Sequence, residues 1–223
     1  MDWFPLLNSL RIAVLSTMLV FFPGLLAANR VTRIPSPALR SLWDALFTLP
    51  IVLPPSIIGW ALLQLLGPRH MFGYWIRQLF GVRMVMTWPA CALASALISF
   101  PFMYRVSRAA FWRFDESLAD IARTLGRSDP WIFWNVQVPV CRNGIVAAAI
   151  LSFARALGES GAARIVAGYI PGRTATLGAS VEYFWSAGDT VQVLIFVALN
   201  LVISVAFLIA VSAFEWAREA DEL

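Results

Sequence analysis

Two charged residues, Arg155 and Glu159, stand four positions apart in the otherwise uncharged stretch of residues 143–163. On a helix this spacing places both side chains on one face, where they can form an ion pair. If the stretch spans a membrane, a charge at its centre costs roughly 2.5–3.5 kcal/mol, so the pair must face the protein interior. Two roles stay open: a structural ion pair, or an arginine that helps to attract a dianion. Because conduction requires weak binding, the structural role is favoured.

Side chains for nucleophilic, metal or phosphate chemistry are scarce. All 17 residues of the Lys and Arg class are arginine, which excludes P-loop, kinase-type and Schiff-base lysines. His70 is the single histidine, and Cys91 and Cys141 are too far apart for a metal or redox motif. Residues 158–161 do not form a nucleophile elbow. We expect no cofactor, no resident metal and no enzymatic activity, with an intramembrane enzyme as a remote alternative. Any ATP-driven step would need a separate subunit.

The composition indicates a membrane protein. Of the 223 residues, 60% are apolar and 13% are charged, and the mean hydropathy is +0.73, whereas a soluble domain is about 25% charged. A spanning helix needs about 20 mostly apolar residues. Five stretches qualify: residues 12–28, 45–68, 84–104, 143–163 and 190–214. The prediction is an all-α polytopic membrane protein with five transmembrane helices, in which residues 1–223 form a single domain.

The arginines predict the orientation. Five spans place the two termini on opposite sides, and more arginines fall on the side that would hold residues 29–44 and 105–142. Cytoplasmic loops are rich in basic residues, so we expect the N-terminus outside and the C-terminus in the cytoplasm. The net charge of +4 is therefore attributed to topology and not to nucleic-acid binding. The first stretch could also be a cleaved signal peptide, but the region before it has no net positive charge, which favours a retained helix.

Three prolines, Pro50, Pro54 and Pro55, interrupt the second stretch. Each removes a backbone donor, so a helix must kink or break there. Broken backbone at membrane depth is tolerated only where protein or a water-filled cavity surrounds it. A helix that lines or gates a pathway and a simple packing kink both remain open.

Two segments on the predicted outer side are too polar to span. Residues 67–83 combine aromatic residues with arginine, which predicts a short amphipathic segment in the membrane interface or a docking surface. In the other segment, Pro171 and Gly172 mark a turn, and Thr174 is expected to cap a short helix over residues 175–185.

The hydrophilic stretch of residues 105–142 predicts two short helices. Ser117 and Asp120 fit a capping box at the start of the first, and Gly126 fits its C-terminal end. Asp129 and Pro130 fit the start of the second. The apolar side chains expected on the pair are Leu118, Ile121, Ala122, Leu125, Trp131, Phe133 and Trp134. This face could rest on lipid or dock a partner.

The spacing in this stretch resembles the coupling motif of ABC importer permeases, which reads EAA, three residues, G, nine residues, then an apolar residue, any residue, Leu and Pro. Here residues 120–122 read Asp-Ile-Ala, Gly126 follows three residues later, and residues 136–139 read Val-Gln-Val-Pro. The departures are Asp for Glu, Ile for Ala and Val for Leu, while the spacing is intact. The resemblance implies that Gly126 lets the chain turn where a side chain would clash.

Residues 49–55 and 153–174 narrow the resemblance to the molybdate and sulfate permeases, with molybdate closest in length and number of spans. Ser160 and Tyr169 depart from the family's Phe and Asn. The resemblance implies the type I ABC importer permease fold in a bacterial inner membrane. The implied partners are a second permease subunit in a homodimer, a cytoplasmic ABC ATPase dimer and an extracytoplasmic oxyanion-binding protein. Sulfate, thiosulfate, tungstate and phosphate are alternative cargoes.

The resemblance also assigns candidate residues to two roles. Those expected to couple to the ATPase, within the loop of residues 115–138 or at its edge, are Asp120, Ile121, Ala122, Leu125, Gly126, Trp131, Phe133 and Pro139. Those expected to line or gate the pathway are Pro54, Pro55, Ser152, Arg155, Gly158 and Glu159.

Overall fold

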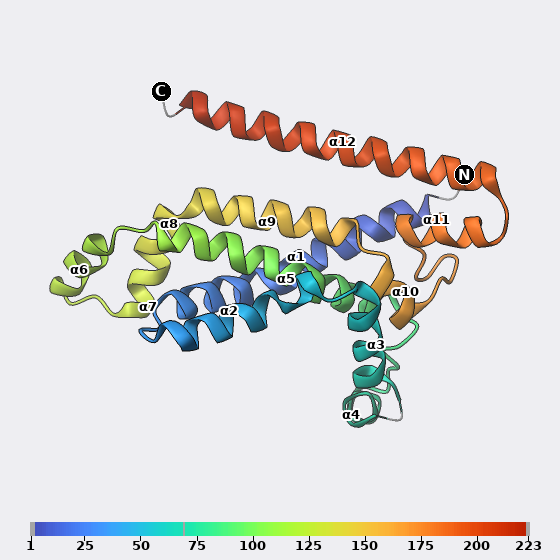
Figure 1. The fold of residues 1–223 in the computed structure, drawn as a ribbon, viewed down its shortest axis with the longest axis horizontal. Helices are drawn as coiled ribbons and strands as arrows, with labels where there is room; N and C mark the ends of the chain where they lie inside the picture. Colours follow the sequence, from blue (N-terminus) through green and yellow to red (C-terminus); the bar gives the residue numbers. More distant parts are fainter. Residues whose placement is uncertain (1–2, 69, 222–223) are drawn as a thin grey trace.

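A computed structural model describes residues 3–68 and 70–221 of the chain, which fold into helices joined by turns (Figure 1). Three long helices, α1 (Phe4–Thr32), α5 (Trp88–Trp112) and α9 (Arg142–Leu157), pack side by side at the centre of the bundle. The other elements are α2 (Pro37–Val52), α3 (Pro55–Leu66), α4 (Met71–Phe80), α6 (Glu116–Thr124), α7 (Asp129–Ile132), the π-helical turn η1 (Phe133–Gln137), α8 (Val138–Val140), α10 (Gly161–Ala167), α11 (Leu177–Ser186) and α12 (Thr190–Asp221).

Small residues allow the central helices to approach closely. A Cβ atom on Gly24 of α1 would lie 2.7 Å from the Cγ atom of Met103 on α5. The hydroxyl of Ser16 on α1 donates to the carbonyl of Ala92 on α5 at 2.8 Å. In a bilayer the lipid tails are as apolar as the helices, so close van der Waals contact and such hydrogen bonds hold the helices together.

The proline run breaks the second predicted span, as expected. α2 ends at Val52, two extended residues follow, and α3 begins at Pro55 with its axis bent by 104° from that of α2. Pro50 is accommodated inside α2. α3 then turns away from the bundle and carries α4 at its far end (Figure 1). The structure therefore places the break at Pro54, where α2 gives way to α3.

Several helices differ in length from the predicted stretches. α5 continues past residue 104 to Trp112, so Arg105 and Arg108 belong to the helix. The stretch of residues 143–163 is divided into α9 and α10. Arginines did not end α5 because their long side chains can reach water from the last turns of a membrane helix.

Within the described part of the chain, three helices are long and apolar enough to cross a membrane: α1, α5 and Thr190–Ser212 of α12. The number rises to five if two bent pairs each count as one span, namely α2 with α3, and Asp129–Val140 with α9. α12 runs back along the bundle from the α11 end and contacts it mainly through α11 (Figure 1). Most of its apolar surface is consequently open to lipid or to another subunit.

The two segments predicted for the outer side contain short helices. Residues 67–83 include α4, in agreement with the predicted short segment. The prediction for Thr174 was wrong, because α11 begins at Leu177 and Thr176 caps it by accepting a hydrogen bond from the Ala179 N–H at 3.3 Å. The hydroxyl of Thr174 instead donates to the Gly168 carbonyl at 3.1 Å and accepts from the Ile170 N–H at 2.9 Å. Thr174 therefore fastens the Pro-Gly turn.

Candidate functional site

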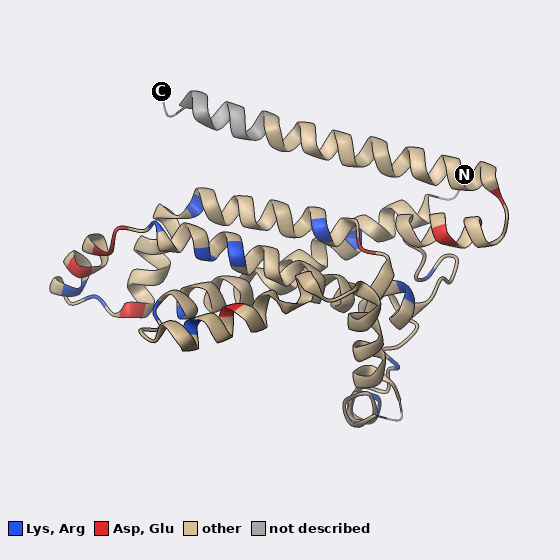
Figure 2. Cartoon of the chain, in the orientation of Figure 1, with Lys and Arg blue, Asp and Glu red and all other residues tan. Residues whose placement is uncertain are grey.

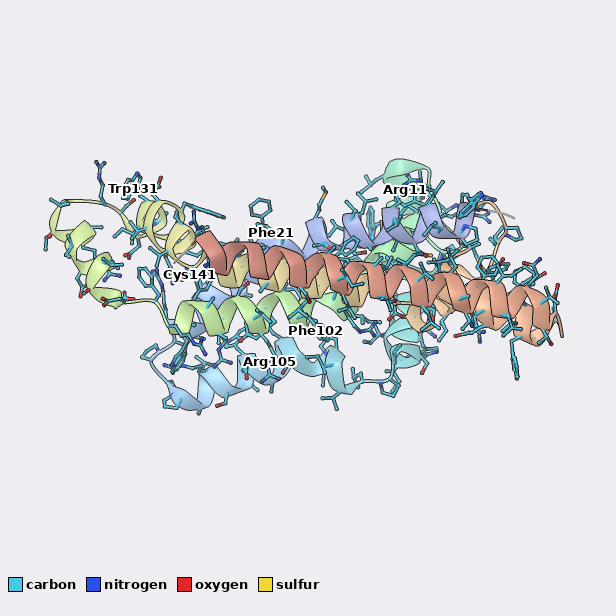
Figure 3. All side chains as sticks on the ribbon, turned by 90° about the horizontal axis from the view of Figure 1, so that it is seen from above. Arg11, Phe21, Phe102, Arg105, Trp131 and Cys141 are labelled. Carbon is cyan, nitrogen blue, oxygen red and sulfur yellow. The ribbon has the colours of Figure 1, made fainter. Side chains whose placement is uncertain are left out.

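The chain between α5 and α9 forms a knuckle, defined as residues 115–138, that projects from one end of the bundle (Figure 1). Charged residues gather on α6 and α7, whereas the helices of the bundle carry few (Figure 2). Trp131 lies at this end and Arg11 near the opposite end (Figure 3). The distribution is that of a polar cap on an apolar body, as expected for a segment that leaves the membrane.

The first knuckle helix, α6, is capped by Asp115 and not by Ser117. The Asp115 carboxylate accepts a hydrogen bond from the Ser117 N–H at 3.0 Å. The hydrogen bonds from Ser117 lower the pKa of Asp115 below its ordinary value. The predicted capping box was therefore wrong, because the helix begins at Glu116. A carboxylate at this position also complements the positive end of the helix dipole.

Arg123 holds the two knuckle helices together by binding three carboxylates. It contacts Glu116 at 3.1 Å and Asp120 at 2.6 Å on α6, and Asp129 at 3.1 Å at the start of α7. These hydrogen bonds raise the pKa of Arg123. Single exposed ion pairs contribute little stability, but this network fixes the angle between α6 and α7. Asp120, the acidic residue of the coupling motif, is thus occupied within the knuckle.

α6 has two apolar faces with different surroundings. Ala119 and Ala122 are buried, 1% and 8% exposed, and pack with Ile132 of α7. Ile121 and Leu125 point away from the chain and are 57% and 74% exposed. The predicted single apolar face is therefore divided: alanines hold the knuckle together, and the larger side chains, together with Leu118 at 39% exposure, are free to meet a partner.

Gly126 ends α6 in the left-handed region, with φ of +76°, and no neighbouring atom lies within 4 Å of a Cβ built there. No clash therefore arises with the described residues of this chain itself. The requirement for glycine comes from the backbone, because a left-handed conformation costs an L-residue roughly 1–2 kcal/mol. The turn lets the Arg127 N–H bond to the Ala122 carbonyl at 3.1 Å.

The aromatic residues of the second knuckle helix divide between surface and interior. Trp131 and Trp134 are 40% and 42% exposed. Phe133 is 3% exposed, with its ring 5.8 Å from Phe111 of α5 and 4.8 Å from Trp134. The expectation that Phe133 lies on the docking face was therefore wrong. Phe133 is therefore one of the contacts through which the knuckle rests on the bundle.

A hydrogen bond also joins the knuckle to the bundle, and a second one lies just beyond the knuckle at Cys141. Gln137 is buried and accepts a hydrogen bond from Arg33, just after α1, at 3.2 Å. The Cys141 thiol donates to the Ala110 carbonyl of α5 at 3.5 Å. Neither Arg33 nor Gln137 was predicted, because a polar pair separated by 104 positions leaves no local pattern. Pro139 is exposed and lies within the short helix α8. The bundle helix α9 begins after α8, at Arg142.

At the other end of α9, Arg155 and Glu159 form the predicted ion pair, with Nη1 and Oε2 3.1 Å apart. The Glu159 side chain is 2% exposed and that of Arg155 is 29% exposed. The second carboxylate oxygen of Glu159 accepts a hydrogen bond from the Ala162 N–H of α10 at 2.8 Å. Glu159 therefore joins α9 to α10 across the break between them.

This break lies against the break between α2 and α3. A Cβ atom on Gly161 would lie 3.1 Å from the Cβ of Pro55, and one on Gly59 of α3 would lie 2.8 Å from the carbonyl oxygen of Ala162. The small residues of α10 thus let the two interrupted helices meet. We call this junction the paired break, comprising Pro54, Pro55, Gly59, Gly158, Glu159, Gly161 and Ala162.

The remaining pathway candidates take different places. Gly158 ends α9, with its N–H bonded to the Ala154 carbonyl at 3.2 Å. Ser152 is buried and donates to the Ser99 carbonyl of α5 at 3.5 Å, so it serves packing within this chain. Pro54 and Pro55 are exposed at the surface of the chain. α9 spans about 24 Å from the knuckle to the paired break, at 1.5 Å per residue.

Comparisons with known proteins agree with this architecture. The family described as the binding-protein-dependent transport system inner membrane component matches residues 21–217. The molybdenum transport system permease protein ModB of Escherichia coli strain K12 is 35% identical over 176 residues, which cover 79% of this chain and 76% of that protein. The sulfate transport system permease protein CysT of the same strain is 35% identical over 151 residues, 68% of this chain and 54% of its own.

Among solved structures, an inward-facing form of the MetNI methionine ABC transporter superposes with a TM-score of 0.74 at 17% identity, covering 97% of each chain. This similarity confirms the predicted all-α fold of a type I ABC importer permease. Together with the match over residues 21–217, it shows that the chain belongs to the family of inner membrane components of binding-protein-dependent transport systems.

Proposed function

We propose that this chain is the permease subunit of an ATP-driven importer for a tetrahedral oxyanion, and that the oxyanion is molybdate. The observation that carries the proposal is the knuckle, which presents Ile121 and Leu125 to the outside while the other face of α6 packs on α7 and Phe133 packs against α5. Exposed apolar side chains on a polar, projecting segment fit a protein partner better than lipid. The resemblance of residues 49–55 and 153–174 to the molybdate and sulfate permeases, together with the 35% identity to the molybdenum permease ModB over 79% of this chain, supports the cargo.

In this proposal the knuckle seats in a cleft of a cytoplasmic ATPase. ATP binding moves this cleft and the knuckle with it. The movement then passes through Phe133 and the Arg33–Gln137 hydrogen bond to α5, α1 and α9. A rigid helix such as α9 then carries the displacement to the paired break about 24 Å away. This is a rigid-body switch between two arrangements of packed helices.

The paired break is proposed as the gate of the pathway. Broken helices place irregular backbone where cargo can pass. In the structure described here the Arg155–Glu159 pair is closed, and the carboxylate neutralises the guanidinium. An arginine held in this way does not trap a dianion, which satisfies the requirement for weak binding along a conducting path.

The proposed assembly is a homodimer of this chain with two ATPase subunits and an extracytoplasmic oxyanion-binding protein. The open apolar surface of α12 leaves room for a second permease subunit. The knuckle side is assigned to the cytoplasm of a bacterial cell, which puts the N-terminus outside and the C-terminus inside. Positive residues on the knuckle side, among them Arg30, Arg105 and Arg113, support this orientation.

Uptake of molybdate at nanomolar concentration tests the proposal, measured in cells with and without this chain and with sulfate in large excess. The expected result is loss of uptake on deletion and no competition by sulfate in intact cells. Sulfate, thiosulfate and tungstate are the alternative cargoes, since the sulfate permease CysT is also similar. Unchanged molybdate uptake after deletion would reassign the cargo to one of them.

A further inference from the structure

Two hollows lie near α2 at the knuckle end of the bundle, one between α1 and α2 and the other on α5. The first, about 480 Å³ in volume, lies between α1 and α2. Its wall is mostly apolar, and among the described residues one charged side chain, that of Arg30, lines it. The residues that form it are Leu26, Ala27, Arg30, Val31, Trp43 and Phe47, with Ile34 beyond α1. An apolar hollow of this kind, open to the surface of a membrane helix pair, suits a hydrocarbon chain.

The second hollow, about 330 Å³, is basic. Arg105, Arg108, Ala109 and Trp112 on the last turns of α5 line it. Arg105 lies on α5 where this helix passes α2 (Figure 3). Arg108 is paired with Asp44 of α2, but its Nε atom is buried and has no hydrogen-bond partner in the described part of the chain. The donor that this hollow offers to a ligand is the guanidinium of Arg105, which has no ion pair in the described part of the chain.

Arg40 lies between the two hollows. Its guanidinium donates to the carbonyl of Ile34, which borders the first hollow, at 3.1 Å from Nε and 2.6 Å from Nη2. Its Cζ atom is 5.1 Å from the ring centre of Trp112, which borders the second. Four arginines thus lie around the start of α2: Arg30, Arg40, Arg108 and Arg105.

The charge at this place is not balanced by the protein. Among these four arginines the only ion pair in the described residues is that of Arg108 with Asp44. Neither Arg30 nor Arg105 has an ion pair or hydrogen bond there. Arginines that serve topology alone need only face water. Arg30, Arg105 and Arg108 instead border the hollows, beside Trp43 or Trp112, and Arg40 contacts the borders of both. They lie at the level where the apolar part of α5 ends, and that is where lipid headgroups lie.

We propose that an anionic phospholipid binds here, with an acyl chain in the hollow between α1 and α2 and its phosphate among the arginines around α2. The apolar hollow favours a phospholipid over a free oxyanion, because a free oxyanion would occupy only the basic hollow. The lipid would bridge α2 to α1 and to α5. It would thereby hold α2, the helix that leads to the break at Pro54, against the bundle. This inference does not depend on the cargo or on the ATPase.

Native mass spectrometry of the full-length permease tests the proposal, with phosphatidylglycerol or phosphatidylcholine titrated into the detergent. Arg30→Gln with Arg105→Gln is the test variant, since both side chains are exposed and free of ion pairs. Arg113→Gln is the matched control, an exposed arginine at the same end that borders neither hollow. Each arginine near a charged lipid surface contributes about fivefold in affinity, so the double variant should bind phosphatidylglycerol about 25-fold more weakly.

The expected result is retention of phosphatidylglycerol but not phosphatidylcholine by the wild type and by Arg113→Gln. If the Arg113→Gln control and the double variant lost phosphatidylglycerol equally, the proposal would be overturned, because the lipid would then be attracted by surface charge in general. Free sulfate and molybdate, added at millimolar concentration, form the second arm and should leave bound lipid in place. Displacement of the lipid by either anion, abolished by Arg105→Gln, would assign the basic hollow to a free oxyanion. If the double variant does not fold, Arg105→Gln alone should show about a fivefold loss.

Discussion

Glu159 binds Arg155 with one carboxylate oxygen and the Ala162 N–H with the other, at 3.1 Å and 2.8 Å, so a single buried side chain joins α9, α10 and a membrane-embedded charge. The arrangement explains why both charged residues can stay in an apolar stretch. It also implies that the two partners are not equivalent, because only Glu159 holds the break together.

We therefore expect Arg155→Met to abolish uptake and to destabilise the permease. Leaving a buried carboxylate without its partner costs roughly 3–5 kcal/mol, and the lower end applies because Arg155 keeps 29% exposure. The double variant Arg155→Met with Glu159→Gln should recover part of the uptake and part of the stability. Glutamine is neutral and still accepts the hydrogen bond from the Ala162 N–H. Thermal unfolding and uptake provide the measurements. A double variant as inactive and unstable as the single one would contradict the structural role and favour contact with the dianion.

Gly126 provides a second prediction, based on its φ of +76°. Gly126→Ala should strain the knuckle by roughly 1–2 kcal/mol and weaken association with the ATPase, although a side chain there meets no neighbour within this chain. Gly126→Asn is the matched control, because asparagine adopts the left-handed region more readily. Co-purification of the ATPase with each variant measures the effect. If alanine is tolerated and asparagine is not, side-chain size at the partner surface decides, and not the backbone.

The divided faces of α6 lead to a third prediction. Ile121→Ser should reduce binding of the ATPase and leave the melting temperature of the isolated permease unchanged, because Ile121 is 57% exposed and contributes little to the knuckle. Ala119→Leu should do the reverse and lower the melting temperature, because overpacking a site that is 1% exposed costs typically 1–3 kcal/mol. Equal effects of both substitutions on stability would show that the two faces are not separate.

Phe133 provides a fourth prediction, which separates docking from transmission. Phe133→Ala removes the contact with Phe111 and should cost about 3–5 kcal/mol locally. The ATPase should still bind through the exposed residues, but ATP hydrolysis should no longer drive uptake. Phe133→Leu keeps an apolar side chain at this position and should retain most of the coupling. Loss of ATPase binding in Phe133→Ala would place the residue on the docking face after all.

The sequence predicted those features that follow from a local pattern. The break at Pro54, the turn at Gly126, the start of α7 at Asp129 and the Arg155–Glu159 pair each depend on residues within a few positions of one another. These are cases in which backbone chemistry or helical spacing decides the outcome.

The errors share a different origin. Phe133 reads as one more aromatic residue on an amphipathic helix, and only its contact with Phe111 reveals that it is buried. Ser117 fits a capping box, but Asp115 competes successfully for the same helix end. The paired break and the Arg33–Gln137 hydrogen bond join segments about 100 positions apart, and a single sequence holds no signal for such contacts.

The most direct test of the central claim, that the exposed face of α6 docks on the ATPase, is site-specific photo-crosslinking in the assembled transporter. A photoreactive residue would replace Leu118, Ile121 or Leu125 on the exposed face, and Trp185, exposed on α11 at the other end of the bundle, as the control. We predict crosslinks to the ATPase from the three α6 positions and none from position 185. Failure of all three α6 positions to crosslink in a complex that still hydrolyses ATP and imports its cargo would contradict the claim.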